Sequence, residues 1–347
     1  MIDINFWKNK KVLITGHSGF KGFWLYKLLE RLESDVLGIS IKDNSSEIYK
    51  IFANQKVAIN EKFIDILDES NLNDEITKFA PDIIFHLAAQ SLVIDAKTEP
   101  KNTIMVNIVG SFNLLNISCF QDKRVGIVVA TTDKVYKQPE IFNDEESPLG
   151  SFEFYGASKV GLENIIDAIN NDSKNRNKIS VVRSGNVIGG GDGAKGRIMT
   201  DLVDSINSNQ RVILRNPESI RPWQFVLDSL GGYLLVAEEN YIENKPEKYN
   251  LNSPSIENVT VHDLSTKLID RFDSNIEINI EKNIKLKESK ELRLNSEKAV
   301  NKLKWKSFYD IDQIVNNIFL WESGKQSGEV LSITKNQIDE YLQMIDS

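Results

Sequence analysis

Two groups of side chains in this 347-residue sequence have the types and spacing for acid–base chemistry. Tyr155 and Lys159 stand at the ends of a Y-G-A-S-K sequence, so on a helix they lie one turn apart on one face. A phenol, with an ordinary pKa of about 10, becomes a base near neutrality only when a neighbouring cation favours the phenolate. Thr132, Asp133 and Lys134 place a hydroxyl, a carboxyl and an amine at successive positions, either as a second acid–base group or as an incidental ion pair on a loop.

A glycine-rich segment has the spacing of a phosphate-binding turn. Gly16, Gly19 and Gly22 follow a short apolar run at 11–15 and open a stretch with helical spacing at 20–32. Gly16 would allow a tight turn, Gly19 would let a pyrophosphate approach the backbone, and Gly22 would allow close packing of helix on strand. The N-terminus of the helix would then face the phosphates. The segment therefore predicts a nucleotide site.

The elements that must position these residues alternate between strands and helices along the first half of the chain. We expect strands at Lys11–Thr15, Asp35–Ile41, Phe63–Leu67, Asp82–Leu87, Val125–Ala130 and Ile179–Arg183, with helices at Phe20–Leu32, Ser70–Phe79, Asn102–Cys119 and Tyr155–Asn170. This order predicts an α/β fold with a Rossmann-type, doubly wound parallel sheet. Because the pattern becomes irregular after Val187, we expect a cofactor domain at 1–186, with chain crossings, and a smaller mixed substrate-binding lobe mainly at 187–347.

Composition excludes several classes of protein. Lys and Arg number 42 against 50 Asp and Glu, a formal charge of −8, which argues against a nucleic-acid partner. The single cysteine, Cys119, cannot form an intramolecular disulfide, and three dispersed histidines show no metal-ligand spacing. Apolar runs are shorter than the roughly 18 residues that span a bilayer. We therefore expect a cytoplasmic protein without a metal or a membrane partner.

Together these motifs resemble those of the extended short-chain dehydrogenases/reductases, and among them the nucleotide-sugar 4,6-dehydratases, with the CDP-glucose enzymes most similar. The resemblance covers nearly the whole chain. It rests on G-H-S-G-F-K-G at 16–22, H-L-A-A-Q at 86–90, T-D-K at 132–134, Y-G-A-S-K at 155–159, G-N-V-I-G-G-G-D at 185–192 and I-R-P-W-Q at 220–224.

The resemblance implies NAD as the cofactor and a nucleoside-diphosphate hexose as the substrate. His17 and Lys21 would then lie beside the pyrophosphate as a donor and a cation. The cofactor-binding residues that it implies are Gly16, His17, Gly19, Phe20, Lys21, Gly22, Asp65, Ile66, Leu87, Ala88, Ala89, Gln90, Tyr155 and Lys159. Ser40, Lys42 and Asp43, at the end of the second strand, carry conflicting signs, so the residues themselves leave NAD or NADP open.

The same resemblance gives roles to the catalytic candidates. Thr132 would bond the reacting sugar oxygen, and Tyr155 would take the proton of the 4-hydroxyl. Lys134 would remove the C5 proton while Asp133 protonates the departing 6-hydroxyl. A lysine base must be neutral, and Lys159 and Asp133 would push its pKa in opposite directions. An epimerase or reductase of this fold would not need the Asp133–Lys134 pair. A protein that only binds NAD would typically lack the tyrosine or the lysine, whereas this chain has both Tyr155 and Lys159.

The second lobe is expected to hold the nucleotide sugar. Asn186, Arg197, Arg215 and Arg221 are the candidate ligands, since guanidinium groups bind phosphate bidentately. Two departures from the resemblance, I-D-A at 94–96 and Gly193, leave the identity of the sugar nucleotide open. The resemblance also implies a homodimer that forms through two helices.

Overall fold

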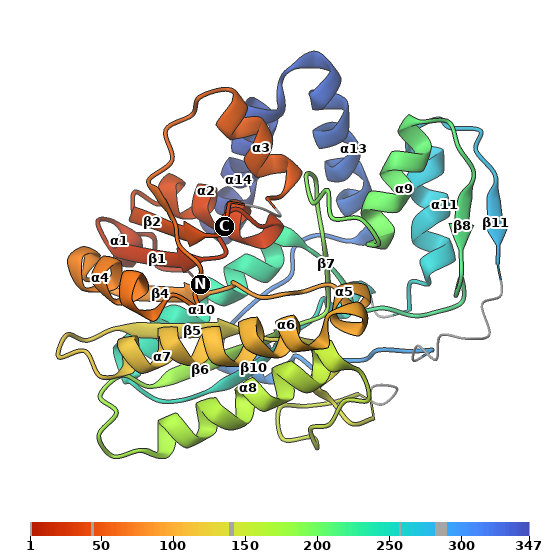
Figure 1. Cartoon of the computed structure of the whole chain (residues 1–347). Coiled ribbons are helices and arrows are strands. Elements are labelled where there is room, and N and C mark those ends of the chain that lie inside the picture. Colours follow the sequence, from red (N-terminus) through yellow and green to blue (C-terminus); the bar gives the residue numbers. More distant parts are fainter. Residues whose placement is uncertain (1, 43–44, 139–141, 257, 282–289, 347) are drawn as a thin grey trace.

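A parallel sheet of seven strands forms the centre of the computed structural model, which describes residues 2–42, 45–138, 142–256, 258–281 and 290–346 (Figure 1). Its order is β10-β6-β5-β4-β1-β2-β3, and each neighbouring pair is parallel. The strands are β1 (Lys11–Thr15), β2 (Asp35–Ser40), β3 (Glu61–Phe63), β4 (Ile83–His86), β5 (Gly126–Ala130), β6 (Ile179–Ser184) and β10 (Lys248–Leu251). The strand order reverses between β1 and β4, which confirms the doubly wound arrangement.

Helices cover both faces of this sheet, so each face buries its own apolar core. In β1, Val12 and Ile14 join one core while Leu13 joins the other, as the alternation of strand side chains requires. The first core includes residues of α2 (Phe20–Arg31) and α10 (Val226–Glu243), and the second includes residues of α4 (Glu69–Phe79), α7 (Ser111–Cys119) and α8 (Phe154–Asn171). Burial of each large aliphatic side chain contributes about 1.5–3 kcal/mol. The strand ends that carry the site are therefore rigidly held.

The second lobe continues from the carboxyl end of β6. Strand β7 (Asn186–Ile188) begins two residues after β6 and pairs with β9 (Trp223–Phe225), and β8 (Val212–Leu214) pairs with β11 (Ile278–Ile280). Helices α9 (Ile198–Asn207) and α11 (Val261–Arg271) lie with β8 and β11 at one end of the molecule, at the right of Figure 1.

The remaining helical elements are short connections and C-terminal helices. They are α1 (Ile4–Trp7), α3 (Glu47–Asn54), α5 (Val93–Thr98), α6 (Pro100–Ile104), the π-helical η1 (Met105–Gly110), the 3-10 turns η2 (Asp133–Val135) and η3 (Pro254–Ile256), α12 (Glu297–Leu303), α13 (Ile311–Ser327) and α14 (Val330–Asp346). None of the helices in the described part of the chain has the length and apolar character needed to cross a membrane.

Several elements differ from the sequence prediction, and three of the differences concern the central sheet and the helices that cover it. The third strand is Glu61–Phe63, so the predicted strand at Phe63–Leu67 is wrong. Ile66 lies in the loop after this strand, and its side chain packs against Gly110. The predicted helix at Asn102–Cys119 is divided by the π-helical η1. The seventh strand, β10, was not predicted and comes from the second half of the chain.

Candidate active site

The glycine turn connects β1 to α2 at the carboxyl edge of the sheet. Gly16 has φ +77°, and a methyl group there would lie 2.7 Å from the backbone nitrogen of Ala88, so only glycine fits. A methyl group on Gly22 would collide with the carbonyl of Gly16. Gly19 is the N-cap of α2. A methyl group added to Gly19 would approach the Gly16 carbonyl oxygen, at 3.2 Å, and no other described atom outside its chain neighbours within 4 Å. The turn thus leaves an open cradle at a helix N-terminus that fits a pyrophosphate.

The Lys21 and His17 side chains of this turn point to different neighbours. The Nζ of Lys21 donates to the Tyr233 hydroxyl at 3.0 Å, and its charge helps to lower the pKa of Lys159, so it lies on the catalytic side. The His17 ring is fully buried beneath the turn, with Nε2 2.6 Å from a Glu61 carboxylate oxygen. The His17 ring is thus turned away from the cradle, and only its backbone remains available to a ligand there.

The loop after β4 lies against the glycine turn and is tied to the catalytic helix. Asn107, on η1, accepts a hydrogen bond from the Gln90 backbone N–H at 2.8 Å and donates to the Gln90 carbonyl at 3.0 Å and to the Ser158 hydroxyl at 2.9 Å. Leu87, Ala88, Ala89 and Gln90 are all partly exposed. The backbone of this loop is therefore held in place while its surface stays open to a cofactor.

The remaining predicted cofactor residues are placed as follows. Phe20 is buried at the start of α2, and Asp65 is exposed with Ile66 buried in the loop after β3. The hydroxyl oxygen of Ser40 lies 2.6 Å from that of Ser18, and Asp43 lies outside the described residues. The end of β2 thus presents Ser40 in a hydrogen bond with the glycine turn.

The catalytic side chains meet where α8 faces the end of β5. Tyr155 is 9% exposed and Lys159 is 3% exposed, and the Thr132 hydroxyl lies near enough to the Tyr155 phenol to act on its pKa. The Lys159 Nζ donates to the Ala130 carbonyl at 3.2 Å. Helix α8 begins here because the Glu153 carboxylate caps the backbone N–H groups of Tyr155 and Gly156. The structure therefore brings together the predicted Thr-Tyr-Lys set.

Burial governs the protonation of this set. Burial raises the pKa of the Tyr155 phenol above its ordinary value, with the negative charge of Asp133 adding to the effect and the Thr132 hydroxyl opposing it. Burial and then the charge of Lys21 lower the pKa of Lys159 to about 7. Without a ligand the phenol is therefore protonated at neutral pH, and the Lys159 ammonium is close to losing its proton.

The second acid–base pair lies beside this set on η2. Asp133 is 3% exposed, and its Oδ1 accepts a hydrogen bond from the Thr132 hydroxyl at 3.0 Å and lies 3.7 Å from the Lys134 Nζ. The Oδ2 of Asp133 is buried and has no hydrogen-bond partner among the described residues. A buried, unsatisfied carboxylate oxygen is costly unless a ligand supplies a partner. The carboxyl therefore has the capacity to bond or protonate a substrate hydroxyl.

The second lobe brings cations toward this centre. Arg197 bonds the Asp192 carboxylate at 2.8 Å and the Ser91 hydroxyl at 3.0 Å, and its charge acts on Tyr155. Arg221 is buried and donates to the Ile220 and Lys290 carbonyls.

The other candidate ligands of this lobe differ in exposure. Arg215 is exposed, and Asn186 is partly exposed at the start of β7. Arg293, which we did not predict, lies on the segment that bridges to Ile220; its Nε donates to a Glu291 carboxylate oxygen at 2.6 Å. Arg293 lies in a segment rich in Lys and Glu, so its charge alone did not distinguish it from its neighbours as a candidate ligand.

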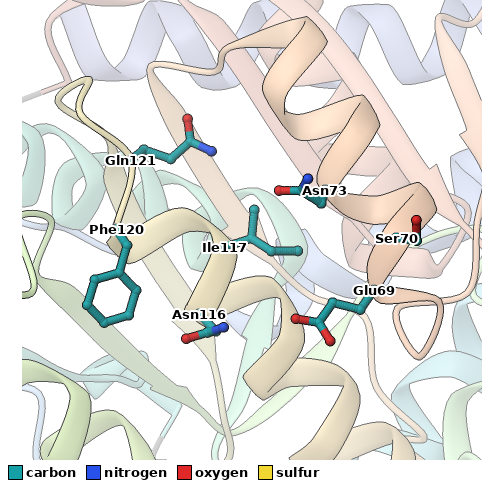
Figure 2. Close-up of a pocket in the computed structure, with 7 residues that line it drawn as sticks. All are labelled: Glu69, Ser70, Asn73, Asn116, Ile117, Phe120 and Gln121. Carbon is teal, nitrogen blue, oxygen red and sulfur yellow. The ribbon is translucent and has the colours of Figure 1, made fainter.

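Other surface features carry no comparable chemistry. A groove between α4 and α7 is lined by Glu69, Ser70, Asn73, Asn116, Ile117, Phe120 and Gln121 (Figure 2). It contains none of the predicted site residues and no nucleophile paired with a base. Across the described ranges, no three His, Cys, Asp or Glu side chains gather as a metal site. The carboxyl edge of the sheet, where the predicted residues gather, is the candidate active site.

Comparisons with known proteins show which family the chain resembles. The family model described as GDP-mannose 4,6 dehydratase matches residues 13–318. The chain is 34% identical to CDP-glucose 4,6-dehydratase of Salmonella typhimurium over 99% of both chains, and 25% identical to dTDP-glucose 4,6-dehydratase of Haemophilus influenzae over 69% of this chain and 76% of the relative. A UDP-glucose-4-epimerase from Stenotrophomonas maltophila, solved with bound NAD and formylated UDP-arabinopyranose, has a TM-score of 0.81 at 18% identity, covering 92% of this chain and 100% of its own.

Proposed function

Because the chain belongs to the GDP-mannose 4,6 dehydratase family, we propose that it is an NAD-dependent nucleotide-sugar 4,6-dehydratase that converts CDP-glucose to CDP-4-keto-6-deoxyglucose. The observation that carries this proposal is the buried Asp133, with its free carboxylate oxygen, beside both Lys134 and the Tyr155–Thr132 pair. An epimerase needs only the Thr132, Tyr155 and Lys159 set. The elimination of water needs an acid and a base in addition, and Asp133 and Lys134 supply them.

The residues at the carboxyl edge fit the proposed cofactor. The cradle at Gly19 would hold the pyrophosphate. Lys21, whose Nζ bonds the Tyr233 hydroxyl on the Lys159 side, would add its positive charge to the bound cofactor. Lys159 would face the nicotinamide ribose, with the Leu87–Gln90 loop beneath it. When bound, NAD supplies the hydride acceptor for the oxidation of C4 and the hydride donor for the reduction of C6.

The first stage of the reaction uses the Thr132, Tyr155 and Lys159 set. The Tyr155 oxygen takes the proton of the sugar 4-hydroxyl, while the Thr132 hydroxyl holds the same sugar oxygen. The Lys159 ammonium favours the phenolate through its charge. Because a buried lysine near another cation loses its proton readily, an anionic ligand beside Lys21 would keep Lys159 charged.

The second stage uses η2. A ketone at C4 makes the C5 hydrogen acidic, and the Lys134 amine, which has to be unprotonated to act as a base, would take that proton. The Asp133 carboxyl gives its proton to the 6-hydroxyl, the C6–O bond breaks and water departs, which leaves a C5–C6 double bond. Lys134 would then return the proton to C5 while C6 gains hydride, which would give a 4-keto-6-deoxy sugar. Every proton therefore passes through a side chain already in the site.

The sugar nucleotide is held by the second lobe in this proposal. Arg197 and Arg221 are placed at the diphosphate, with Arg215, Asn186 and the Arg293 segment around the nucleoside. Cytidine rests on the similarity to the Salmonella enzyme. Ile94 and Gly193, near the expected sugar, are where a different nucleoside-diphosphate hexose would be selected instead.

A panel of substrates tests the proposal. The protein is incubated with NAD and each of CDP-, UDP-, GDP- and dTDP-glucose and GDP-mannose, followed by mass spectrometry and alkaline absorbance of the 4-keto product. We expect CDP-glucose to lose one water. Loss of water from another substrate only would correct the nucleotide, whereas an isomer of unchanged mass would show an epimerase. Binding of NAD without any turnover would contradict an enzymatic function.

We also infer a cytoplasmic homodimer. Ile104, Met105, Val109 and Phe112 form an exposed apolar stripe along α6, η1 and α7, and no described part of the chain covers it. Such stripes at helical spacing are typical of helix–helix interfaces. Sedimentation of wild type and of Phe112→Glu tests this inference. We expect a dimer that the charge dissociates, and a wild-type monomer would contradict the homodimer.

A further inference from the structure

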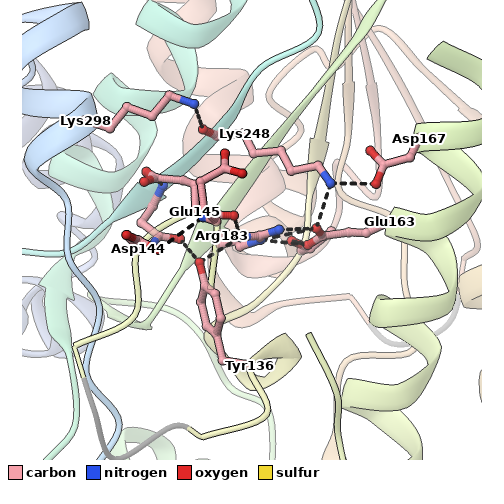
Figure 3. Close-up of polar contacts among 11 residues, drawn as sticks. Tyr136, Asp144, Glu145, Glu163, Asp167, Arg183, Lys248 and Lys298 are labelled. Carbon is pink, nitrogen blue, oxygen red and sulfur yellow. Dashed lines mark hydrogen bonds and ion pairs between the residues drawn. The ribbon is translucent and has the colours of Figure 1, made fainter. Parts of the chain in front are cut away.

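Two buried ionic side chains lie directly behind the catalytic turn without touching the space for the substrate. Glu163 on α8 and Arg183 on β6 are 0% and 1% exposed, and the guanidinium bonds both carboxylate oxygens, at 3.0 Å and 2.5 Å (Figure 3). Removing two charges from water costs about as much free energy as their attraction returns. Stability alone therefore gives a weak reason for this pair, and its geometry is more informative.

The pair holds both ends of the Thr132–Val135 segment. At the first end, the Thr131 hydroxyl donates to the Glu163 Oε1 at 2.8 Å. At the other end, the Arg183 Nη1 donates to the Tyr136 hydroxyl at 2.7 Å, and the guanidinium lies over the Tyr136 ring, 5.0 Å from its centre. The segment with Asp133 and Lys134 is thus fixed just before its first residue and just after its last.

The same pair sets the distance from this segment to the catalytic helix. Glu163 lies one turn after Lys159 and two turns after Tyr155, so the three side chains share one face of α8. Any displacement of the Thr131–Tyr136 chain relative to this face must break a hydrogen bond to Glu163 or Arg183. Glu163 and Arg183 therefore fix the position of Asp133 and Lys134 relative to Tyr155.

A chain of hydrogen bonds continues from Tyr136 to the second lobe. The Tyr136 hydroxyl donates to the Asn250 Oδ1 at 2.6 Å, and the Asn250 amide nitrogen donates to the Asn143 carbonyl at 2.9 Å and the Asn295 carbonyl at 3.1 Å. Asn295 follows Arg293 by two residues. The catalytic turn is thus connected to the segment that approaches Arg221.

We propose that Glu163, Arg183 and Tyr136 are positioning residues for the elimination stage, which hold Asp133 and Lys134 against the sugar that Tyr155 has oxidised. This inference rests on the proposed dehydratase function. According to this inference, buried residues that do not contact the substrate set the rate of elimination without changing the rate of oxidation.

Tyr136→Phe tests the proposal, because it keeps the ring and removes only the hydroxyl between Arg183 and Asn250. Its matched control is Tyr249→Phe, which removes another buried hydroxyl, bonded to Glu239 at 2.6 Å on the same sheet. Stopped-flow nicotinamide absorbance and product release are measured together. We expect kcat for dehydration to fall by about 10- to 100-fold in Tyr136→Phe with little change in KM, while the reduced-cofactor signal builds up.

Arg183→Lys should also slow elimination more than oxidation, because lysine keeps the positive charge but cannot bond both Glu163 and Tyr136. Tyr249→Phe should behave as wild type. Equal slowing of both stages in Tyr136→Phe, or no slowing, would overturn the proposal.

Hydrogen–deuterium exchange gives a readout that does not depend on turnover. We expect faster exchange at residues 131–137 in Tyr136→Phe and not in Tyr249→Phe, and unchanged exchange would overturn the positioning role. A wild-type protein that removes no water from any nucleotide hexose would instead refute the proposed function, and the exchange result would still decide whether the turn is held as inferred.

Discussion

At the scale of single residues, the site combines groups whose protonation is set by burial. The Tyr155 phenol has a raised pKa and the Lys159 ammonium a lowered one, so the ligand-free site carries little charge on this pair near neutrality. Asp133 brings a carboxylate oxygen with no partner into the same space. The substrate and cofactor must therefore supply the hydrogen bonds and charges that complete the site.

Tyr155→Phe should abolish the oxidation of C4. The variant loses the oxygen that accepts the 4-hydroxyl proton, and the glycine turn is untouched, so NAD affinity should stay within a few-fold of wild type. We expect turnover to fall by about 10²–10⁴-fold, the contribution of a positioned base. Calorimetry of NAD binding is the control. Near-normal turnover would remove Tyr155 from the mechanism.

Asp133→Asn should separate oxidation from elimination. The amide keeps the shape of the carboxyl but cannot protonate the departing 6-hydroxyl, so a reduced-nicotinamide absorbance should build up on mixing with substrate. Dehydrated product should fall by about 10²–10⁴-fold. Tyr155→Phe is the control, since it should show no such signal. Wild-type product formation by Asp133→Asn would show that this residue is not the acid.

At the scale of elements, local sequence signals located most of the sheet and the catalytic helix. The glycine spacing and the four-residue Tyr155–Lys159 interval are local, and the structure has both where the sequence predicted them. Long-range contacts decided the rest. The His17 ring pairs with Glu61, 44 residues away, and the segment that carries Arg293 is placed by a bridge between Glu291 and Ile220. Strand β10 has the sequence K-Y-N-L, too short and too polar for a strand prediction.

Two glycines of the turn should respond differently to substitution. Gly19→Val should fold and lose NAD affinity, because its φ of −73° accepts a side chain that then fills the cradle. Gly16→Ala should destabilise the fold by at least about 1 kcal/mol, because its φ is positive and Ala88 leaves no space. Thermal unfolding and NAD titration of both variants test this prediction. A folded Gly19→Val protein with full NAD affinity would show that the turn is only structural.

At the scale of the whole molecule, α10 joins the sheet to the C-terminal helices through one buried acid. The Asp228 carboxylate accepts the backbone N–H groups of Phe308 at 3.0 Å and Tyr309 at 3.2 Å, just before α13. Burial raises the pKa of Asp228 from 3.8 to about 7, although these hydrogen bonds oppose the shift. The folded state therefore binds a proton that the unfolded chain has already lost between these two pH values.

Stability should accordingly fall as pH rises from about 4 to about 7, by up to about 1.4 kcal/mol per unit from this group. Asp228→Asn should flatten that slope in urea unfolding between pH 4 and 8. Part of the slope should remain, since burial also raises the pKa of Glu238 to about 7. Asp312→Asn, at an exposed side chain nearby, is the control. Equal slopes in wild type and Asp228→Asn would contradict this assignment.

The position of β10 has a consequence for how this enzyme can be altered. A chain cut after residue 186 loses the strand that pairs with β6 and the helix α10 that covers β5 and β6, which leaves an open sheet edge prone to aggregation. Residues 1–186 and 187–347 therefore cannot be exchanged separately between related proteins. Exchange of one half would break the sheet, whereas a point substitution in a loop leaves the shared scaffold intact.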